Sequence, residues 1–238
     1  MRWRIELLGG LRARQGSRSL ARFRSQKTGV LLGYLARHLG WRHAREVLVE
    51  LLWPGCHPEA GRNSLSTALR SLRRQLEPPG SPTGAILVAD RNTVGLNSES
   101  VETDVAEFED LLRAAAGAER EADRVTRLAD AVELYGGDFM AAHYEDWILL
   151  EQQRLADAFH GAVRTLLTRL EAAGDVGRAM EYASRAVRTD PLREEAHCDL
   201  IWKRAEHERT LASLRAEIGE ATFSAAWKDG WESAADRR

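Results

Sequence analysis

The sequence contains little cysteine. Its 238 residues include two cysteines, Cys56 and Cys198, which stand far apart in the chain. Zinc sites are built from closely spaced cysteine and histidine residues, and disulfide-stabilised domains need several cysteines. Neither pattern is present, so we expect no zinc site and no disulfide framework.

Long hydrophobic runs are also missing. No stretch approaches the roughly 18 consecutive apolar residues that a membrane-spanning helix needs. The first ten residues, MRWRIELLGG, alternate apolar and charged side chains where a secretory signal peptide would be apolar. We therefore expect a cytoplasmic protein with no membrane partner.

The sequence lacks the motifs of common enzyme classes. Gly9 and Gly10 are not followed by the Lys-Ser/Thr pair of a phosphate-binding loop, and the seven histidines show no HExxH spacing. No set of residues has the spacing of a catalytic site. We therefore expect a protein that is not an enzyme and that needs no cofactor or metal.

The charge is unevenly distributed along the chain. Residues 1–100 contain 16 Lys and Arg against 7 Asp and Glu, net +9, whereas the remainder contains 18 against 29, net -11. A basic region of this size predicts an anionic partner, and nucleic acid is the commonest one. The acidic remainder is expected to be a second domain with a different role.

The first hundred residues show the pattern of a winged helix-turn-helix. Trp3, Ile5 and Leu7 alternate with charged residues, which predicts a strand. Helical periodicity then predicts three helices, and two apolar runs around a polar centre predict a β-hairpin. The expected helices begin near Lys27, near Val47 and near Arg62, and the hairpin covers residues 86–96. We assign residues 1–98 to this α+β domain.

Residues 103–238 read as entirely helical. Small residues such as Ala179, Ala183 and Ala186 would let antiparallel helices approach closely, and a helical pair of about 34 residues is the size of a tetratricopeptide repeat. The predicted fold class is therefore mainly α: an N-terminal winged helix-turn-helix followed by an all-α tetratricopeptide-like domain. The tail from about residue 203 departs from the repeat pattern.

The third helix, expected over residues 62–76, has two distinct faces. On a helix, Leu65, Leu69, Leu72 and Leu76 form one narrow stripe, which predicts the buried face. The opposite face gathers polar and basic side chains: Arg62, Asn63, Ser66, Thr67, Arg70, Arg73 and Arg74. Such a helix suits the major groove, where Arg donates to guanine and Ser, Thr or Asn reach phosphates or base edges.

Two further observations bear on this interpretation. Surface helices often carry solvated arginines, but residues 62–76 contain no acidic partner for an i,i+4 pair. Arg62, at the expected helix start, would lie near a phosphate assisted by free backbone N–H groups. The hairpin offers Arg91 and Asn92 at its tip, where a wing would touch the DNA backbone or minor groove. We expect these residues to bind double-stranded DNA.

Several segments resemble one family. LLGGLRARQGSRSL, SQKTGVLLGYLARHLG, REVLVELLWPGCHPEAGRNSLSTALRSLRRQL, LVADRNTVGLN, TDVAEFEDLL and DAVELYGGDFMAAHYEDWILLEQQRL occur in the order found in the antibiotic regulatory protein (SARP) family. Its members join an OmpR/PhoB-type winged helix to a bacterial transcriptional activation domain (BTAD). The wing differs from many members, which have a Gly-Tyr pair where this chain reads DRNTVG, and so does the segment after Ile201.

The resemblance implies a sequence-specific transcriptional regulator, commonly an activator, bound as a homodimer to direct repeats and in contact with RNA polymerase. It places DNA contacts on the same residues of the third helix, with Arg91 in the wing. It also implies a cytoplasmic, nucleoid-associated protein. The alternative is a helical-repeat adaptor for other proteins whose DNA-binding domain is vestigial.

Overall fold

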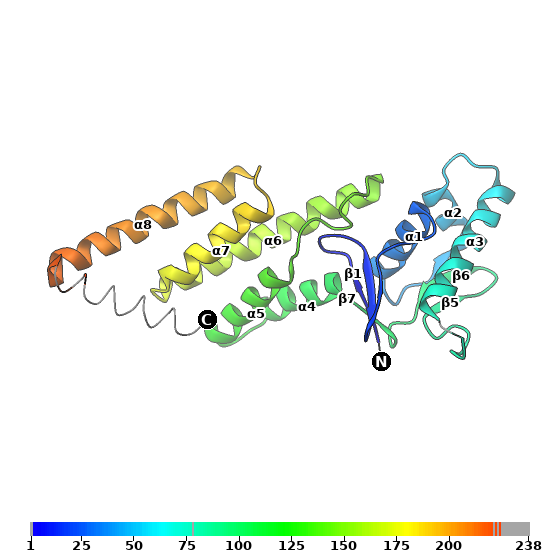
Figure 1. Ribbon diagram of the computed structural model, residues 1–238, viewed down its shortest axis with the longest axis horizontal. Coiled ribbons are helices and arrows are strands. Elements are labelled where there is room, and N and C mark those ends of the chain that lie inside the picture. The colour runs from blue at the N-terminus through cyan, green and yellow to red at the C-terminus, as the bar shows by residue number, and fades with distance from the viewer. Residues whose placement is uncertain (1, 78, 221, 223, 225–238) are drawn as a thin grey trace. The chain divides into compact units, whose positions relative to one another are not determined.

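The computed structural model describes residues 2–77, 79–220, 222 and 224, and Figure 1 shows their helices and strands. The chain divides into two compact units, Met1–Ala162 and Val163–Arg238. The division falls inside one long helix, well after the boundary near residue 100 at which we expect the two sequence domains to meet. Each unit is described by itself.

The first unit begins with a sheet that has four strands among the described residues. Their spatial order is β3 (Arg18–Leu20), β2 (Arg12–Gln15), β1 (Trp3–Glu6) and β7 (Val101–Thr103). β2 pairs antiparallel with β1 and with β3, whereas β7 pairs parallel with β1. Trp3 and Ile5 are fully buried, as their alternation with charged residues predicts.

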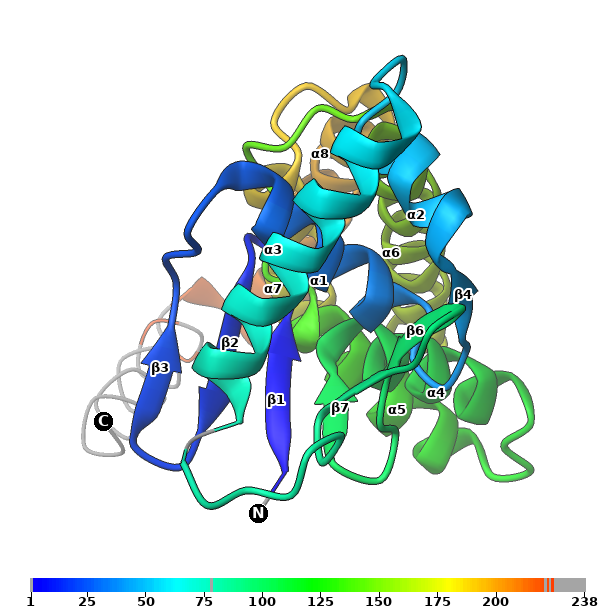
Figure 2. The same cartoon turned by 90° about the vertical axis from the view of Figure 1, so that its right-hand side faces the viewer.

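Three helices and a small second sheet complete the winged helix-turn-helix. The helices are α1 (Gln26–Arg37), α2 (Arg45–Leu52) and α3 (Pro58–Leu76). The second sheet has the order β4 (His43–Ala44), β6 (Thr93–Leu96), β5 (Leu87–Ala89), all antiparallel, and Figure 2 shows β4 beside β6. The β5–β6 hairpin is the wing. The predicted fold class is confirmed for this part of the chain.

Helix α3 starts earlier than its sequence pattern predicts. We expected Pro58 to break the chain and the helix to begin near Arg62, but Pro58 is the first helical residue. Proline suits that position because its fixed φ is helical and its missing N–H would have no intrahelical partner. The N–H of Gly61 already donates to the carbonyl of His57, at 3.0 Å. Arg62 therefore lies within the hydrogen-bonded helix, and the expectation that free backbone N–H groups assist it was wrong.

Helices α4 (Asp104–Ala116) and α5 (Glu121–Leu134) form an antiparallel pair, and α6 (Asp146–Ala172) follows them (Figure 1). The ring of Tyr135 stacks on Phe159 with centroids 4.4 Å apart, and Phe108 lies 5.6 Å from Tyr135. All three rings are buried. These aromatic contacts join α4, α6 and the residue after α5 in the core of the first unit.

The second unit contains the end of α6, then α7 (Val176–Thr189) and α8 (Glu194–Ile218). The carboxylate of Asp175 caps α7 by accepting from the N–H of Arg178, at 3.2 Å. Ala179, Ala183 and Ala186 are buried where α7 packs on α8, as the small-residue spacing predicts. The all-α prediction for this region is confirmed. The last part of the atypical tail, residues 225–238, lies outside the described residues.

One buried carboxylate ties the start of α4 to the N-terminal strand segment. Asp104 is 4% exposed, and its two oxygens accept hydrogen bonds from the N–H of Leu7 at 2.8 Å and from the N–H of Leu8 at 2.9 Å. Burial raises the pKa of Asp104, and the N–H groups of Leu8, Leu7 and Val105 oppose that rise. The contact spans almost a hundred residues of chain, so it fixes β1 against α4.

We predict that Asp104→Ala lowers the free energy of unfolding by roughly 2–4 kcal/mol, because two buried N–H groups lose their acceptor. Asp110→Ala is the matched control, since this exposed carboxylate on the same helix pairs with exposed Arg113 and should contribute about 0.5 kcal/mol or less. Urea denaturation followed by circular dichroism measures both. Equal losses in the two variants would contradict the role given to Asp104.

Candidate nucleic-acid interface

Helix α3 buries its leucine face and exposes its polar face, as its periodicity predicts. Leu65, Leu69, Leu72 and Leu76 are each at most 4% exposed. Of the predicted contact residues on α3, all but one are exposed: Arg62, Asn63, Ser66, Thr67, Arg70 and Arg74. The wing residue Arg91 is also exposed. The helix therefore presents a polar and basic face to solvent.

Two grooves flank this face. One encloses about 440 Å³ between α3, the start of α2 and the wing, and its lining includes Arg45, Ser66, Arg70 and Arg74. Arg45 was not among the residues predicted from sequence. Such grooves on either side of an exposed helix are where the phosphates of a duplex would pass if the helix entered the major groove.

The second groove, about 410 Å³, lies between the start of α1 and α3 and is lined by Arg24, Lys27, Asn63 and Thr67 among others. Lys27 makes an ion pair with Glu145 at 3.4 Å, so part of its charge is neutralised within the protein. Arg24 and Lys27 were not predicted as contacts. The basic composition of residues 1–100 was the available signal for them, but it does not single out individual side chains.

Most of the predicted arginines have no acidic partner. Within the part of the chain that the structure describes, Arg62, Arg70, Arg74 and Arg91 take part in no ion pair. A guanidinium group without an internal partner keeps all of its donors available to a ligand. These four residues therefore meet the requirement for contact with phosphate or guanine.

Arg73 differs from its neighbours. Its Nε lies 3.2 Å from Oε2 of Glu77, and its Nη2 donates to the carbonyl of Leu87 in β5 at 3.1 Å. The expectation that these arginines lack an i,i+4 acidic partner was therefore wrong for Arg73, because Glu77 lies one residue beyond the window that was considered. Its side chain is 37% exposed. The structure commits much of the Arg73 guanidinium to contacts within the protein.

The tip of the wing is a well-defined turn built on Asp90. One carboxylate oxygen of Asp90 accepts from the N–H groups of Asn92 and Thr93, both at 2.7 Å, and the other accepts from Arg42 at 2.6 Å. The N–H groups of Thr93 and Asn92 lower the pKa of Asp90. Arg91 and Asn92 are exposed at this tip, in the place that the hairpin pattern predicts.

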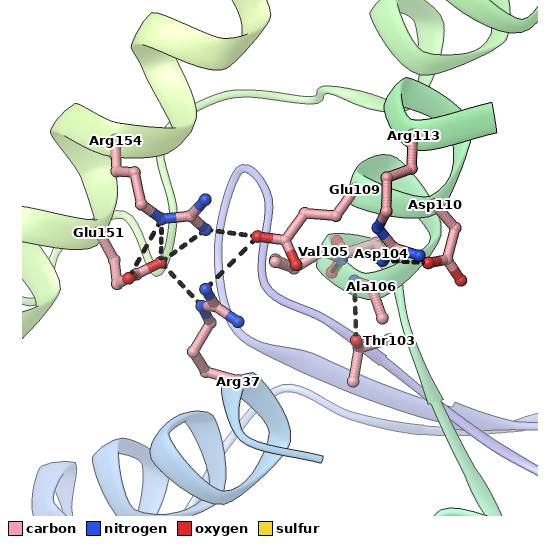
Figure 3. Close-up of polar contacts among 10 residues, drawn as sticks. All are labelled: Arg37, Thr103, Asp104, Val105, Ala106, Glu109, Asp110, Arg113, Glu151 and Arg154. Carbon is pink, nitrogen blue, oxygen red and sulfur yellow. Dashed lines mark hydrogen bonds and ion pairs between the residues drawn. The ribbon is translucent and has the colours of Figure 1, made fainter. Parts of the chain in front are cut away.

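A network of four charged side chains fixes α1, which packs on α3. Figure 3 shows Arg37 of α1 beside Glu109 of α4 and Glu151 of α6. Nε of Arg37 donates to Glu151 at 2.7 Å, and Arg154 donates to Glu109 at 2.6 Å and to Glu151 at 2.9 Å. Burial of Glu151 opposes its ionisation, but the hydrogen bonds from Arg154 and Arg37 outweigh this and lower its pKa. The half-buried network therefore fixes the end of α1 against α4 and α6.

Aromatic rings make a second contact between α1 and α6. The ring of Tyr34 meets Trp147 edge to face, with centroids 5.2 Å apart, and lies 4.6 Å from His38 and 4.9 Å from His43. Burial lowers the pKa of both histidines. For His38 the charges of Arg37 and His43 add to this effect, and that of Glu151 opposes it. The folded protein therefore favours the neutral form of both imidazoles.

No metal or membrane site is evident in the described chain. Its histidine, cysteine, aspartate and glutamate side chains form no group of three that could hold a metal ion. Across the same residues, we find no helix with both the length and the apolar character that crossing a bilayer requires.

Comparisons with known proteins identify the second part of the chain. Residues 103–216 match the family model of the bacterial transcriptional activator domain. The fold is similar to that of Mycobacterium tuberculosis EmbR in complex with a low-affinity phosphopeptide, with a TM-score of 0.68 and 19% sequence identity over 94% of this chain. The chain spans 63% of the length of that EmbR chain. No curated protein sequence matches the chain.

The fold and the family match together define a class of protein: a winged helix-turn-helix followed by a bacterial transcriptional activator domain. This is the architecture that the sequence motifs indicated: the activator-domain match covers residues 103–216, and the fold is similar to that of EmbR.

The lowered pKa values of His38 and His43 predict how stability depends on pH. Their folded pKa values lie below the ordinary value of 6.5, so unfolding takes up protons as the pH falls. Their contribution is present above about pH 6.5 and is lost as the pH falls through the folded values. We expect the free energy of unfolding to fall between about pH 7.5 and 5.5. The fall should be smaller in a His38→Phe/His43→Phe variant.

Urea denaturation at several pH values measures this difference. The matched control is His57→Phe, which replaces an exposed histidine just before α3 and should keep the wild-type pH dependence. If the double variant has the same pH profile as the wild type, the two histidines are not the source of the dependence.

Proposed function

We propose that the protein is a transcriptional regulator that reads duplex DNA with α3 and touches the adjoining backbone or minor groove with its wing. The observation that carries this proposal is the exposed face of α3, on which Arg62, Arg70 and Arg74 have no acidic partner among the described residues. Arginine donates two hydrogen bonds to O6 and N7 of guanine, and serine, threonine and asparagine reach phosphates or base edges.

Each predicted residue except Arg73 has a place in this proposal. Arg70 and Arg74 face the groove toward the wing, with Ser66, whereas Asn63 and Thr67 face the groove toward α1. Arg62 lies one turn into α3 and is suited to a phosphate near its start. Arg91 at the wing tip would meet the flanking backbone. Arg24, from the turn before α1, and Arg45, at the start of α2, are added as phosphate contacts.

The helical part supports the regulatory half of the proposal. Residues 103–216 match an activator domain, so we infer that DNA binding places this domain beside a promoter and that RNA polymerase is its partner. A homodimer on direct repeats and a location at the nucleoid in the cytoplasm belong to the same proposal. We infer no catalytic activity and no cofactor, because the proposed function requires neither.

Selection of bound sequences from random duplex DNA tests whether α3 reads a DNA sequence. We predict that the wild type enriches a motif, and that Arg70→Ala/Arg74→Ala loses base preferences because each base contact contributes about 1–3 kcal/mol, roughly 5- to 150-fold in affinity. For a dimer on direct repeats, two half-sites should recur in one orientation about 10 base pairs, or a multiple, apart. Each lost phosphate contact should lower the salt slope of log affinity by about 0.9.

The matched control for this experiment is Arg113→Ala/Arg120→Ala, which removes two exposed positive charges from the α4–α5 pair, outside both grooves. It should keep the motif and the salt slope. If folded wild-type protein enriches no sequence at low or high salt, the hypothesis that α3 reads DNA is wrong and the protein-adaptor alternative is favoured.

A further inference from the structure

The end of α3 is joined to the wing by two side chains. Glu77 directly follows α3, and its side chain is 5% exposed. Its Oε1 accepts from the N–H of Ile86 at 3.0 Å and from the N–H of Leu87 at 2.9 Å. Its Oε2 faces Nε of Arg73 at 3.2 Å, and Arg73 donates to the carbonyl of Leu87. We call Arg73 and Glu77 the wing clasp.

The wing clasp occupies the open edge of the wing. β5 is an edge strand, because it pairs with β6 on one side only. In an antiparallel ladder alternate residues bond to the partner strand, and here Ile86 accepts from Asn97 while Asp90 donates to Thr93. The backbone groups of Leu87 therefore point away from β6. Arg73 and Glu77 take both its N–H and its carbonyl, which would otherwise be unpaired in a part of the strand that is buried.

The tip of the wing is fixed separately. The N–H of Arg45, the first residue of α2, donates to the carbonyl of Asn92 at 2.9 Å, and its Nε donates to the carbonyl of Asp90 at 3.0 Å. The tip of the wing is bonded to α2, which packs on α3, and the base of the wing is bonded to the end of α3. Both parts of the wing are therefore positioned by α3. Arg91 is thereby held at a set position relative to α3.

We propose that Arg73 and Glu77 are positioning residues that set the wing against α3, and that Arg73 acts through the wing instead of reading a base. The wing clasp then determines how far the flanking backbone contact of Arg91 lies from the bases that α3 reads. This inference rests on the proposed DNA reading for its effect on specificity. Its structural part, the ordering of the wing, can be tested without DNA.

Amide hydrogen exchange tests that structural part. In Glu77→Ala, the N–H groups of Ile86 and Leu87 lose their acceptor, and their exchange should accelerate about tenfold or more. Arg74→Ala is the matched control, because it removes the neighbouring exposed arginine and should leave wing exchange unchanged. Unchanged exchange in folded Glu77→Ala would overturn the clasp, whatever the protein does with DNA.

The second arm uses two conservative variants, Arg73→Lys and Glu77→Gln. Lysine keeps the charge but not the forked donors, and glutamine keeps an acceptor but not the ion pair. Both should retain the motif under α3 and lose backbone protection at the wing-side flank in hydroxyl-radical footprints. The double variant should be no weaker than either single one, since both act on the same contact.

The outcomes separate the two hypotheses. If Arg73→Lys relaxes one motif position while Glu77→Gln binds as tightly as the wild type or more tightly, Arg73 reads a base and the inference is wrong. Glu77 is informative because its carboxylate is repelled by phosphates, so any effect of Glu77 on DNA binding must act through the wing. If the wild type selects no motif, the proposed function fails, and the exchange measurement still decides whether the clasp orders the wing.

Discussion

The burial of α1 on opposite sides is the constraint on which the rest of the first unit depends. One side packs on α2, α3 and the wing strand β6, and the other meets residues that come before and within α6. Gly33 makes this possible, because a methyl group there would overlap the sulfur of Met140. Ion pairs fix both ends of α1 to this second side: Lys27 pairs with Glu145 near the start, and Arg37 pairs with Glu151 at the end. A helix enclosed in this way has no freedom to tilt without breaking both sets of contacts.

The position of α3 follows from that of α1. Its leucine stripe packs toward α1, and its last carbonyls are taken by groups from the N-terminal sheet region: the indole N–H of Trp3 donates to Leu76, and Arg18 donates to Gln75. These contacts satisfy carbonyls that a helix end otherwise leaves unpaired. Among the described residues, no contact of this kind involves the polar face of α3, so most of its arginines stay exposed to solvent. Helix α3 can expose its basic face because its leucine face and its C-terminal end are fixed by other contacts.

The sequence was sufficient to predict what depends on local periodicity. The stripe Leu65 to Leu76 and the wing hairpin are each set by residues within a few positions of one another, and the structure has them as expected. The start of α3 was misplaced because proline both breaks helices and begins them, and only the loop before Pro58 decides which occurs. The roles of Arg73 and Asp104 could not be found in this way. Arg73 donates to the carbonyl of Leu87, and Asp104 accepts from the N–H groups of Leu7 and Leu8. Both roles depend on partners that only the folded chain brings close, so local periodicity does not reveal them.

The boundary between the winged helix and the segment that matches the activator domain is not a boundary in packing. The family match starts at residue 103, and a division of the sequence near residue 100 remains our prediction, yet the compact unit continues to Ala162. The reason is visible in three contacts: β7 completes the N-terminal sheet beside β1, Asp104 binds the N–H groups that follow β1, and Glu109 and Glu151 bind Arg37 (Figure 3). The first helices of the activator segment are therefore part of the support of α1, and through α1 of the support of α3. A change in the position of the first turns of α6 would act on Arg37 and Tyr34, which lie on α1, the helix that packs against α3.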